Sequence, residues 1–155
     1  MPPATLLKPA VLGLGLAAAL ATTASRAAPV QCPEGQGVYR AVSGPPHELI
    51  FQGTKGVLAL AKGLSRVRYP FEVTASNGFS RTYVTVPGKG APSSVAMGFN
   101  PDFTAYRGEG SASYLVTPDL PVGFHYWEPF RSRADAYDLL PGDAWQLVRC
   151  SNPQR

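Results

Sequence analysis

The densest group of side chains suited to ligand binding lies in residues 123–133, Gly-Phe-His-Tyr-Trp-Glu-Pro-Phe-Arg-Ser-Arg. This segment holds four aromatic residues, one histidine and two arginines. Exposed aromatic rings with polar neighbours form flat surfaces for a sugar ring or a protein partner. We therefore take His125, Trp127, Arg131 and Arg133 as candidate ligand-binding residues, with a glycan or an envelope protein as the expected ligand.

The same segment is predicted to form a strand at residues 124–128, and this sets how its side chains point. Alternate residues of a strand face opposite sides. In one arrangement Phe124 and Tyr126 enter the core, and His125 and Trp127 stand outside it. In the alternative, Trp127 is buried and covers the other side of a two-layer core, as is common for large aromatic side chains.

A catalytic reading depends on His125, which would act as an acid or base beside a carboxylate such as Glu128 or Asp135. A histidine-based metal site usually needs two or three clustered ligands. In a strand, His125 and Glu128 point to opposite faces. The other histidine, His47, is expected to be exposed at the start of a strand. We therefore predict no metal and no cofactor, and we assign no catalytic residue.

Motifs for a serine nucleophile or a phosphate-binding loop are incomplete. Ser65 and Ser80 each lie two residues after a glycine, but they lack the second glycine of the nucleophile elbow. The glycine-rich residues 108–111 lack the lysine of a phosphate loop. These residues are predicted to form a loop between strands.

Residues 1–27 have the composition of a cleaved secretory signal peptide. Lys8 is the only charge before an apolar core at residues 11–21, and Ser25-Arg26-Ala27 puts small residues at the −3 and −1 positions. A cut after Ala28 is the alternative, but proline would then follow it and fit an extended protease substrate poorly. A spanning helix needs about 20 apolar residues. We expect no stable membrane span after cleavage.

Residues 28–155 are then predicted to form a single domain outside the cytoplasm, either periplasmic or released. Cys32 and Cys150 are the only cysteines. An even pair in an oxidising compartment usually forms a disulfide. Closing so long a loop would stabilise the fold by roughly 4–5 kcal/mol in the chain-entropy model.

The charge balance argues against a nucleic-acid partner. The chain has 14 basic and 10 acidic residues, and removing Lys8 and Arg26 leaves 12 against 10, a net charge of +2. The basic residues are dispersed, without the cluster that nucleic-acid binding requires.

Short segments between glycines and prolines predict an all-β fold, a small sandwich or barrel of short antiparallel strands with one or two short helices at most. Asn77-Gly78 is a strong hairpin signal. Placed in the turn, it pairs Phe71 with Val84 and sets Pro70 at an edge or bulge, because proline has no N–H to donate. A second hairpin is expected around residues 100–102. Further strands are predicted at residues 38–42, 48–52, 114–117 and 145–150.

Two segments leave room for helix. Residues 55–64 fit a strand or a buried helix equally well, and a helix there would make the fold α+β. Ser132 resembles a helix N-cap, with an acidic residue three positions later. That helix would run to Leu140 and end at the following Pro-Gly pair.

Taken together, these features favour an exported, non-catalytic binding module of the bacterial envelope. A small periplasmic hydrolase using His125 is one alternative. The other is a structural envelope component that self-associates through an exposed strand edge near Pro70. The sequence leaves the ligand and the oligomeric state open.

Overall fold

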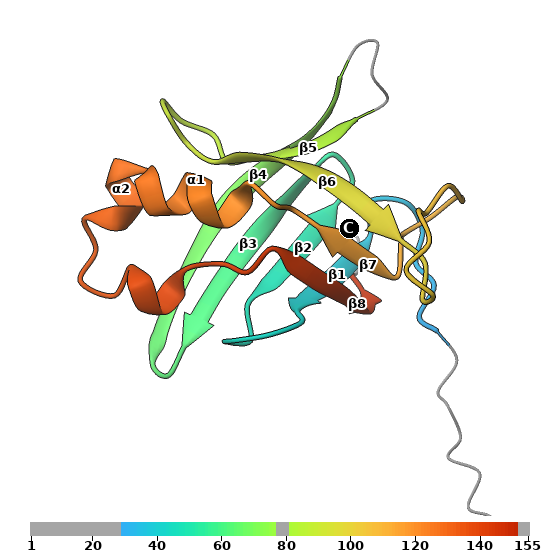
Figure 1. Cartoon of the computed structure of the whole chain (residues 1–155), viewed down its shortest axis with the longest axis horizontal. Coiled ribbons are helices and arrows are strands. Elements are labelled where there is room, and N and C mark those ends of the chain that lie inside the picture. The colour runs from blue at the N-terminus through green and yellow to red at the C-terminus, as the bar shows by residue number, and fades with distance from the viewer. Residues whose placement is uncertain (1–28, 77–80, 152–155) are drawn as a thin grey trace, which may run out of the picture.

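The computed structural model describes residues 29–76 and 81–151, and its central feature is a closed eight-stranded antiparallel barrel (Figure 1). Each strand pairs with the next in sequence, and the last pairs with the first. The strands are β1 (Gly37–Ala41), β2 (Glu48–Gln52), β3 (Lys55–Lys62), β4 (Ser65–Ala75), β5 (Thr82–Thr85), β6 (Ser93–Phe99), β7 (Tyr114–Val116) and β8 (Ala144–Cys150). The all-β prediction is confirmed, in its barrel form. The predicted signal peptide lies outside the described residues.

Several strands agree with the sequence predictions because they are short segments bounded by glycine, proline and other turn residues. The segments predicted at 38–42, 48–52, 114–117 and 145–150 correspond to β1, β2, β7 and β8, with ends that agree within one residue. The ambiguous segment 55–64 is strand β3 rather than helix. The α+β alternative is therefore not the fold observed.

The barrel core is made by inward-facing residues from most of the strands. Leu58 and Leu60 alternate with partly exposed neighbours along β3 and are almost completely buried. Phe71 of β4 and Trp145 of β8 are buried in the same cluster. The indole N–H of Trp145 donates a hydrogen bond to Thr117 Oγ1 at 2.9 Å, so the one polar atom of this side chain has a partner.

The predicted hairpin between β4 and β5 exists, but its register differs from the prediction by two residues. Val73 pairs with Val84 and Ala75 pairs with Thr82, whereas a tight turn at Asn77-Gly78 would pair Phe71 with Val84. A two-residue shift leaves each side chain on its predicted face, because strand side chains alternate with a period of two. Asn77-Gly78 itself lies outside the described residues.

Pro70 lies where pairing between β4 and β5 has already ended, as its missing donor predicts. Pro70 is opposite Val57 of β3, and the last pair with β5 involves Glu72. The N–H of Val73 donates to Thr54 O beside β3. Strand alternation therefore directs the nitrogen of Pro70 away from β3, so no ladder hydrogen bond is lost.

The second predicted hairpin is present as a tight turn only. The N–H of Phe103 donates to Asn100 O at 3.0 Å, and Phe99 and Ala105 form an isolated bridge. The chain then leaves the sheet before β7 returns to pair with β6.

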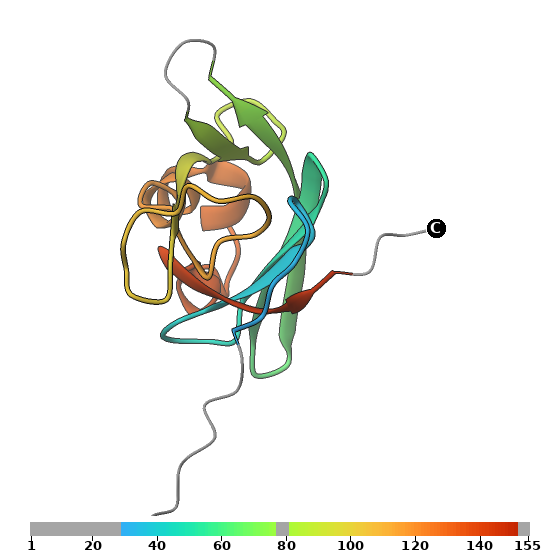
Figure 2. The ribbon, with the colours of Figure 1, turned by 90° about the vertical axis from the view of Figure 1, so that its right-hand side faces the viewer.

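Residues between β7 and β8 form two short helices and a 3₁₀ turn that lie at one end of the barrel (Figure 1). They are α1 (Leu120–Tyr126), α2 (Glu128–Arg131) and η1 (Tyr137–Leu139). Viewed from the other end, they lie behind the ring of strands (Figure 2). None of the helices in the described part of the chain is long and apolar enough to cross a membrane.

The prediction of a strand at residues 124–128 is wrong, because this segment contains the end of α1 and the start of α2. Pro121 and Pro129 each lie in the first turn of a helix. Proline is well tolerated there, since its fixed φ suits a helix and its missing N–H is not needed. Phe124 and Phe130 are buried against the barrel. The aromatic content favoured a strand, but the prolines and this helical arrangement decided the structure.

Ser132 also differs from its prediction. It is the C-cap of α2 rather than the N-cap of a following helix, and its hydroxyl donates to Glu128 O at 2.8 Å. The later helical turn, η1, has Leu140 as its C-cap, just before Pro141.

Candidate functional site

The residues selected from the sequence lie at the helical end of the barrel, and Trp127 among them is mainly structural. Its ring lies edge-on to those of Tyr69 and Phe124, with centroids 5.6 and 5.9 Å away. The side chain packs against the core. Its Nε1 is buried and has no hydrogen-bond partner among the described residues. The structure is therefore closer to the buried alternative for Trp127 than to an exposed platform.

Arg133 is held by an ion pair. Its guanidinium lies 2.9 Å from Asp135 Oδ1 and donates a hydrogen bond to Asp135 Oδ2 at 3.0 Å. Hydrogen bonding from Arg133 is the main reason why the pKa of Asp135 falls below its usual value. Arg133 Nε is buried with no partner in the described structure. This pairing makes Arg133 a poor candidate for a free ligand-binding group.

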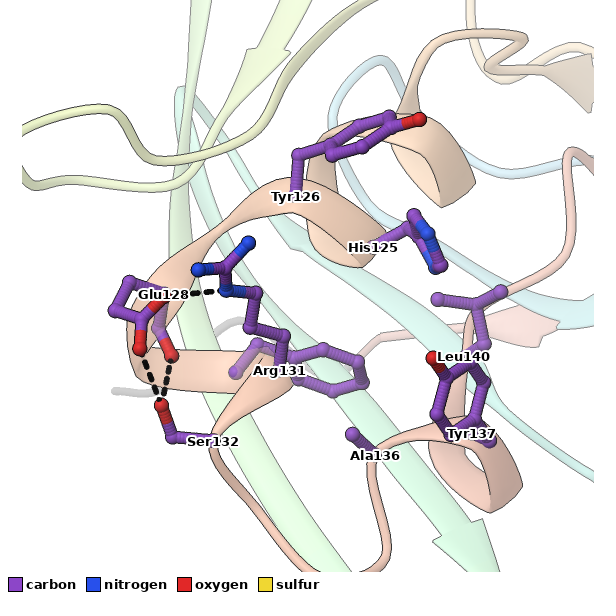
Figure 3. Close-up of a pocket in the computed structure, with 9 residues that line it drawn as sticks. His125, Tyr126, Glu128, Arg131, Ser132, Ala136, Tyr137 and Leu140 are labelled. Atoms are coloured by element: carbon purple, nitrogen blue, oxygen red, sulfur yellow. Dashed lines mark hydrogen bonds and ion pairs between the residues drawn. The ribbon is translucent and has the colours of Figure 1, made fainter.

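His125 and Arg131 line a small pocket of about 290 Å³ on the surface of the helices (Figure 3). The His125 ring lies 4.8 Å from that of Tyr126 and 6.0 Å from that of Tyr137, centroid to centroid. Both tyrosines are largely exposed, at 69% and 83%. These aromatic rings surround one side of the pocket, and Arg131 lies on the other (Figure 3).

The nearest candidate carboxylate, Glu128, is occupied by other partners. Ser132 Oγ donates to Glu128 Oε1 at 2.8 Å, and Arg131 Nε donates to Oε2. The Ser132 hydrogen bond, followed by that of Arg131, lowers the pKa of Glu128. Within the described part of the chain, His125 makes no hydrogen bond to a carboxylate. The pairing that the hydrolase alternative requires is not present at this pocket.

A larger cavity of about 910 Å³ opens at the other end of the barrel. The side chains that line it include Tyr39, Phe51, Val73, Ala96, Ala112 and Leu115. They come from five different strands and from the segment before β7.

Small residues create this space on the β6 side of the barrel. Ala96 and Gly98 lie at alternate positions of β6 and line the cavity. A Cβ atom added to Gly98 would lie 2.9 Å from Ala112 Cβ and 3.3 Å from Tyr106 Cβ. Gly98 therefore allows the segment before β7 to pack closely against β6. The helical end is instead filled by large aromatic side chains such as Phe124 and Phe130.

The disulfide holds one wall of the cavity mouth. Cys32 and Cys150 are bonded, with their Cα atoms 5.3 Å apart, so the predicted pairing is confirmed. The N–H of Ser111 donates to Cys32 O at 2.9 Å, and its hydroxyl donates to Pro33 O at 3.0 Å. Gly110 has a φ of +92°, and a Cβ there would lie 2.7 Å from Cys32 O. The glycine-rich loop is thus fastened to the disulfide segment.

The floor of the cavity is uncharged, and its charged side chains lie at the rim. The Tyr39 hydroxyl donates to Ala112 O at 2.9 Å, and burial raises the pKa of Tyr39 to about 12. In the described part of the chain, the charged residues of the lining are Glu34, Arg81 and Glu109, and all three are exposed. A molecule with an apolar part and one polar end would therefore place its apolar part in the cavity and its polar end toward solvent.

His47 was expected to be exposed and is instead completely buried. Its Nδ1 accepts a hydrogen bond from the N–H of Ala61 at 2.9 Å, while Nε2 is buried without a partner in the described structure. Burial is the main reason why the pKa of His47 is lowered, and a backbone contact with Leu140 opposes this effect. Contacts with residues distant in sequence, Ala61 of β3 and the backbone of Leu140, accompany the burial of this ring.

Sequence reasoning missed the barrel cavity. The signal available was the run of small residues at alternate positions, Ser94, Ala96 and Gly98, but this pattern has no meaning until the strand's inward face is known. No group of three or more potential metal ligands occurs within the described ranges. Comparison of this chain with protein-family models, curated proteins and solved structures finds no match.

Proposed function

We propose that this protein is an exported, non-catalytic binding protein that holds a small ligand in the open end of its barrel. The observation that carries the proposal is the cavity of about 910 Å³, which is open at the mouth and uncharged at the floor. Ligand sites are typically mostly apolar hollows of about 300–1,000 Å³ with a few polar groups. An eight-stranded barrel is just wide enough either to fill with side chains or to hold one small ligand.

The polar groups of the cavity are suited to holding a molecule rather than reacting with it. The hydroxyl of Tyr39 is committed to a backbone carbonyl, and burial raises its pKa to about 12, further above physiological pH than that of an ordinary tyrosine. Tyr106 likewise donates its hydroxyl to the carbonyl of Glu109. Both groups are fixed in place by backbone partners, which favours a preformed site.

Export is supported by two independent features. The sequence begins with a predicted signal peptide over residues 1–27, and the domain contains a disulfide between Cys32 and Cys150. Disulfides persist in oxidising compartments such as the periplasm. The binding of a glycan or an envelope protein by His125, Trp127, Arg131 and Arg133 remains a prediction.

The proposal is tested by titrating the purified mature protein with N-phenyl-1-naphthylamine, an uncharged fluorescent probe for apolar sites. We expect saturable binding of one probe per chain. Ala96→Phe, which places a large ring in the cavity, should weaken binding at least about tenfold, equivalent to about 1.4 kcal/mol. Ala59→Leu is the matched control, because Ala59 alternates with the inward-facing Leu58 and Leu60 and so lies on the outer face of β3.

Two outcomes would contradict the proposal. The first is a lack of saturable binding by a folded wild-type protein. The second is unchanged binding in Ala96→Phe together with loss of binding in His125→Ala, which would assign the probe to the pocket on the helices.

A further inference from the structure

The charges at the cavity mouth indicate what kind of molecule it accepts. We infer that the ligand is an apolar molecule with a basic head group, such as an alkylamine, and that the head group lies between Glu34 and Glu109. This inference rests on the proposed function. The apolar part would enter the barrel toward Tyr39 and Phe51. The ammonium group would remain at the rim in partial contact with water.

Two carboxylates lie on neighbouring segments of the mouth. Glu34 follows the disulfide residue Cys32 closely, and Glu109 precedes Ser111, whose N–H and hydroxyl bind the carbonyls of Cys32 and Pro33. These hydrogen bonds bring the two segments together. Neither carboxylate forms an ion pair with any described residue, so both are available to a ligand.

Among the described residues that line the cavity, Arg81 is the one positive side chain, and it lies across the barrel from Glu34. Arg81 directly precedes β5, whereas Glu34 precedes β1, and these strands are on opposite sides of a closed ring of eight. Arg107 and Lys55 lie nearby in sequence but are not among the residues that line the cavity. The lining therefore carries two negative charges and one positive charge, although the mature chain has a net charge of +2.

An aromatic ring adds to the attraction for a cation. Tyr106 lines the same side of the cavity, and its hydroxyl is bound to the carbonyl of Glu109. A cation over an aromatic face gains electrostatic stabilisation from the ring. An anionic head group would instead meet two carboxylates on this side, and a neutral one would gain nothing from them.

The inference is tested by competition between matched eight-carbon ligands. Octylamine, octanol and octanoate are each used to displace the bound N-phenyl-1-naphthylamine from the wild-type protein. Exposed ion pairs contribute modestly, at most about fivefold in affinity each. We expect octylamine to compete roughly twofold to tenfold more strongly than octanol, and octanoate to compete more weakly than octanol.

Glutamine variants remove the charges of the mouth carboxylates and so distinguish their contribution to the octylamine preference from general effects of substitution. Replacing both Glu34 and Glu109 by glutamine should remove most of the preference for octylamine while leaving displacement by octanol unchanged. Arg81→Gln should increase the preference. Glu72→Gln is the matched control, because Glu72 is exposed on β4 and does not line the cavity.

The possible failures of the two proposals are distinguishable. If the three ligands compete equally, or if octanoate competes best, the inference of a basic head group is wrong while the cavity remains a binding site. An octylamine preference that persists in the double variant would also overturn it. If neither the probe nor any competitor binds the folded protein, the proposed function itself is wrong, and this inference falls with it.

Discussion

The buried imidazole of His47 accepts a hydrogen bond through Nδ1 from the backbone N–H of Ala61 at 2.9 Å. This bond joins the start of β2 to β3. A proton on Nδ1 would remove the acceptor and place a charge in a buried site. The pair therefore connects the protonation state of one side chain to the stability of the barrel.

Acid should destabilise the protein through His47. Because burial lowers its pKa below the usual value of about 6.5, the unfolded chain binds the proton first as the pH falls. This contribution to stability is complete above pH 6.5 and is lost progressively below it, down to the lowered pKa. In the wild type, the free energy of unfolding measured with urea between pH 5 and 8 should decrease as the pH falls, and this dependence is the slope to be compared.

The slope should be absent in His47→Gln, whatever that variant's stability at neutral pH. His125→Ala is the matched control, because His125 is exposed, and it should retain the slope. An unchanged slope in His47→Gln would show that other groups cause the acid sensitivity.

Removing the disulfide should reduce both stability and ligand affinity. The bond joins residues 118 positions apart, so replacing Cys32 and Cys150 by serine should cost about 4–5 kcal/mol in the chain-entropy model. The mouth wall attached to Cys32 should also become less ordered. Thermal unfolding measures the first effect, and probe titration well below the melting temperature measures the second. Full retention of probe affinity would mean that the backbone hydrogen bonds of Ser111 hold the wall alone.

Truncating Trp127 should destabilise the fold. Replacement of a buried aromatic residue by alanine typically costs 3–5 kcal/mol, and because Trp127 is half-buried we expect about 2–3 kcal/mol for Trp127→Ala. Its contacts with Tyr69 and Phe124 would be lost. Tyr126→Ala, an exposed neighbour, should change the free energy of unfolding by less than about 0.5 kcal/mol. Equal stability of the two variants would contradict a structural role for Trp127.

The hydroxyl of Thr117 should matter because it satisfies the buried indole of Trp145. Thr117→Val keeps the shape but leaves the indole N–H without an acceptor, at a cost of about 1–3 kcal/mol. Thr85→Val is the control, since Thr85 bonds an exposed serine hydroxyl. Chemical denaturation should give a lower free energy of unfolding for Thr117→Val than for Thr85→Val. A Thr117→Val variant as stable as the wild type would mean that the indole finds another partner.

Local sequence patterns were enough to predict most of the strands and the disulfide. Strand β2, residues 48–52, was located from its own residues, since a short apolar run bounded by Pro45-Pro46 and Gly53 is typical of a strand. The disulfide followed from the pairing of the only two cysteines with a predicted signal peptide. The position of Pro70 beyond the last β4–β5 pair followed from its missing donor.

The sequence prediction was wrong at residues 124–128, where signals for strand and for helix competed. The aromatic run at residues 124–128 has the composition of a strand, but Pro121 and Pro129 suit the first turn of a helix. In the structure the helices bury Phe124 and Phe130 at the barrel end. In this arrangement Trp127 packs against the core and Arg133 pairs with Asp135, and their roles in ligand binding stay predictions.

Tertiary structure alone decided the cavity and the burial of His47. A small residue such as Ala96 makes a hollow only when the residues across the ring, such as Tyr39 and Phe51, leave that volume empty. Which residues lie across the ring depends on the pairing of β1 with β8, two strands at opposite ends of the domain. The sequence specifies which face of each strand is apolar, but closure and register determine how the inward side chains fill the interior, because volume is a property of all the walls together.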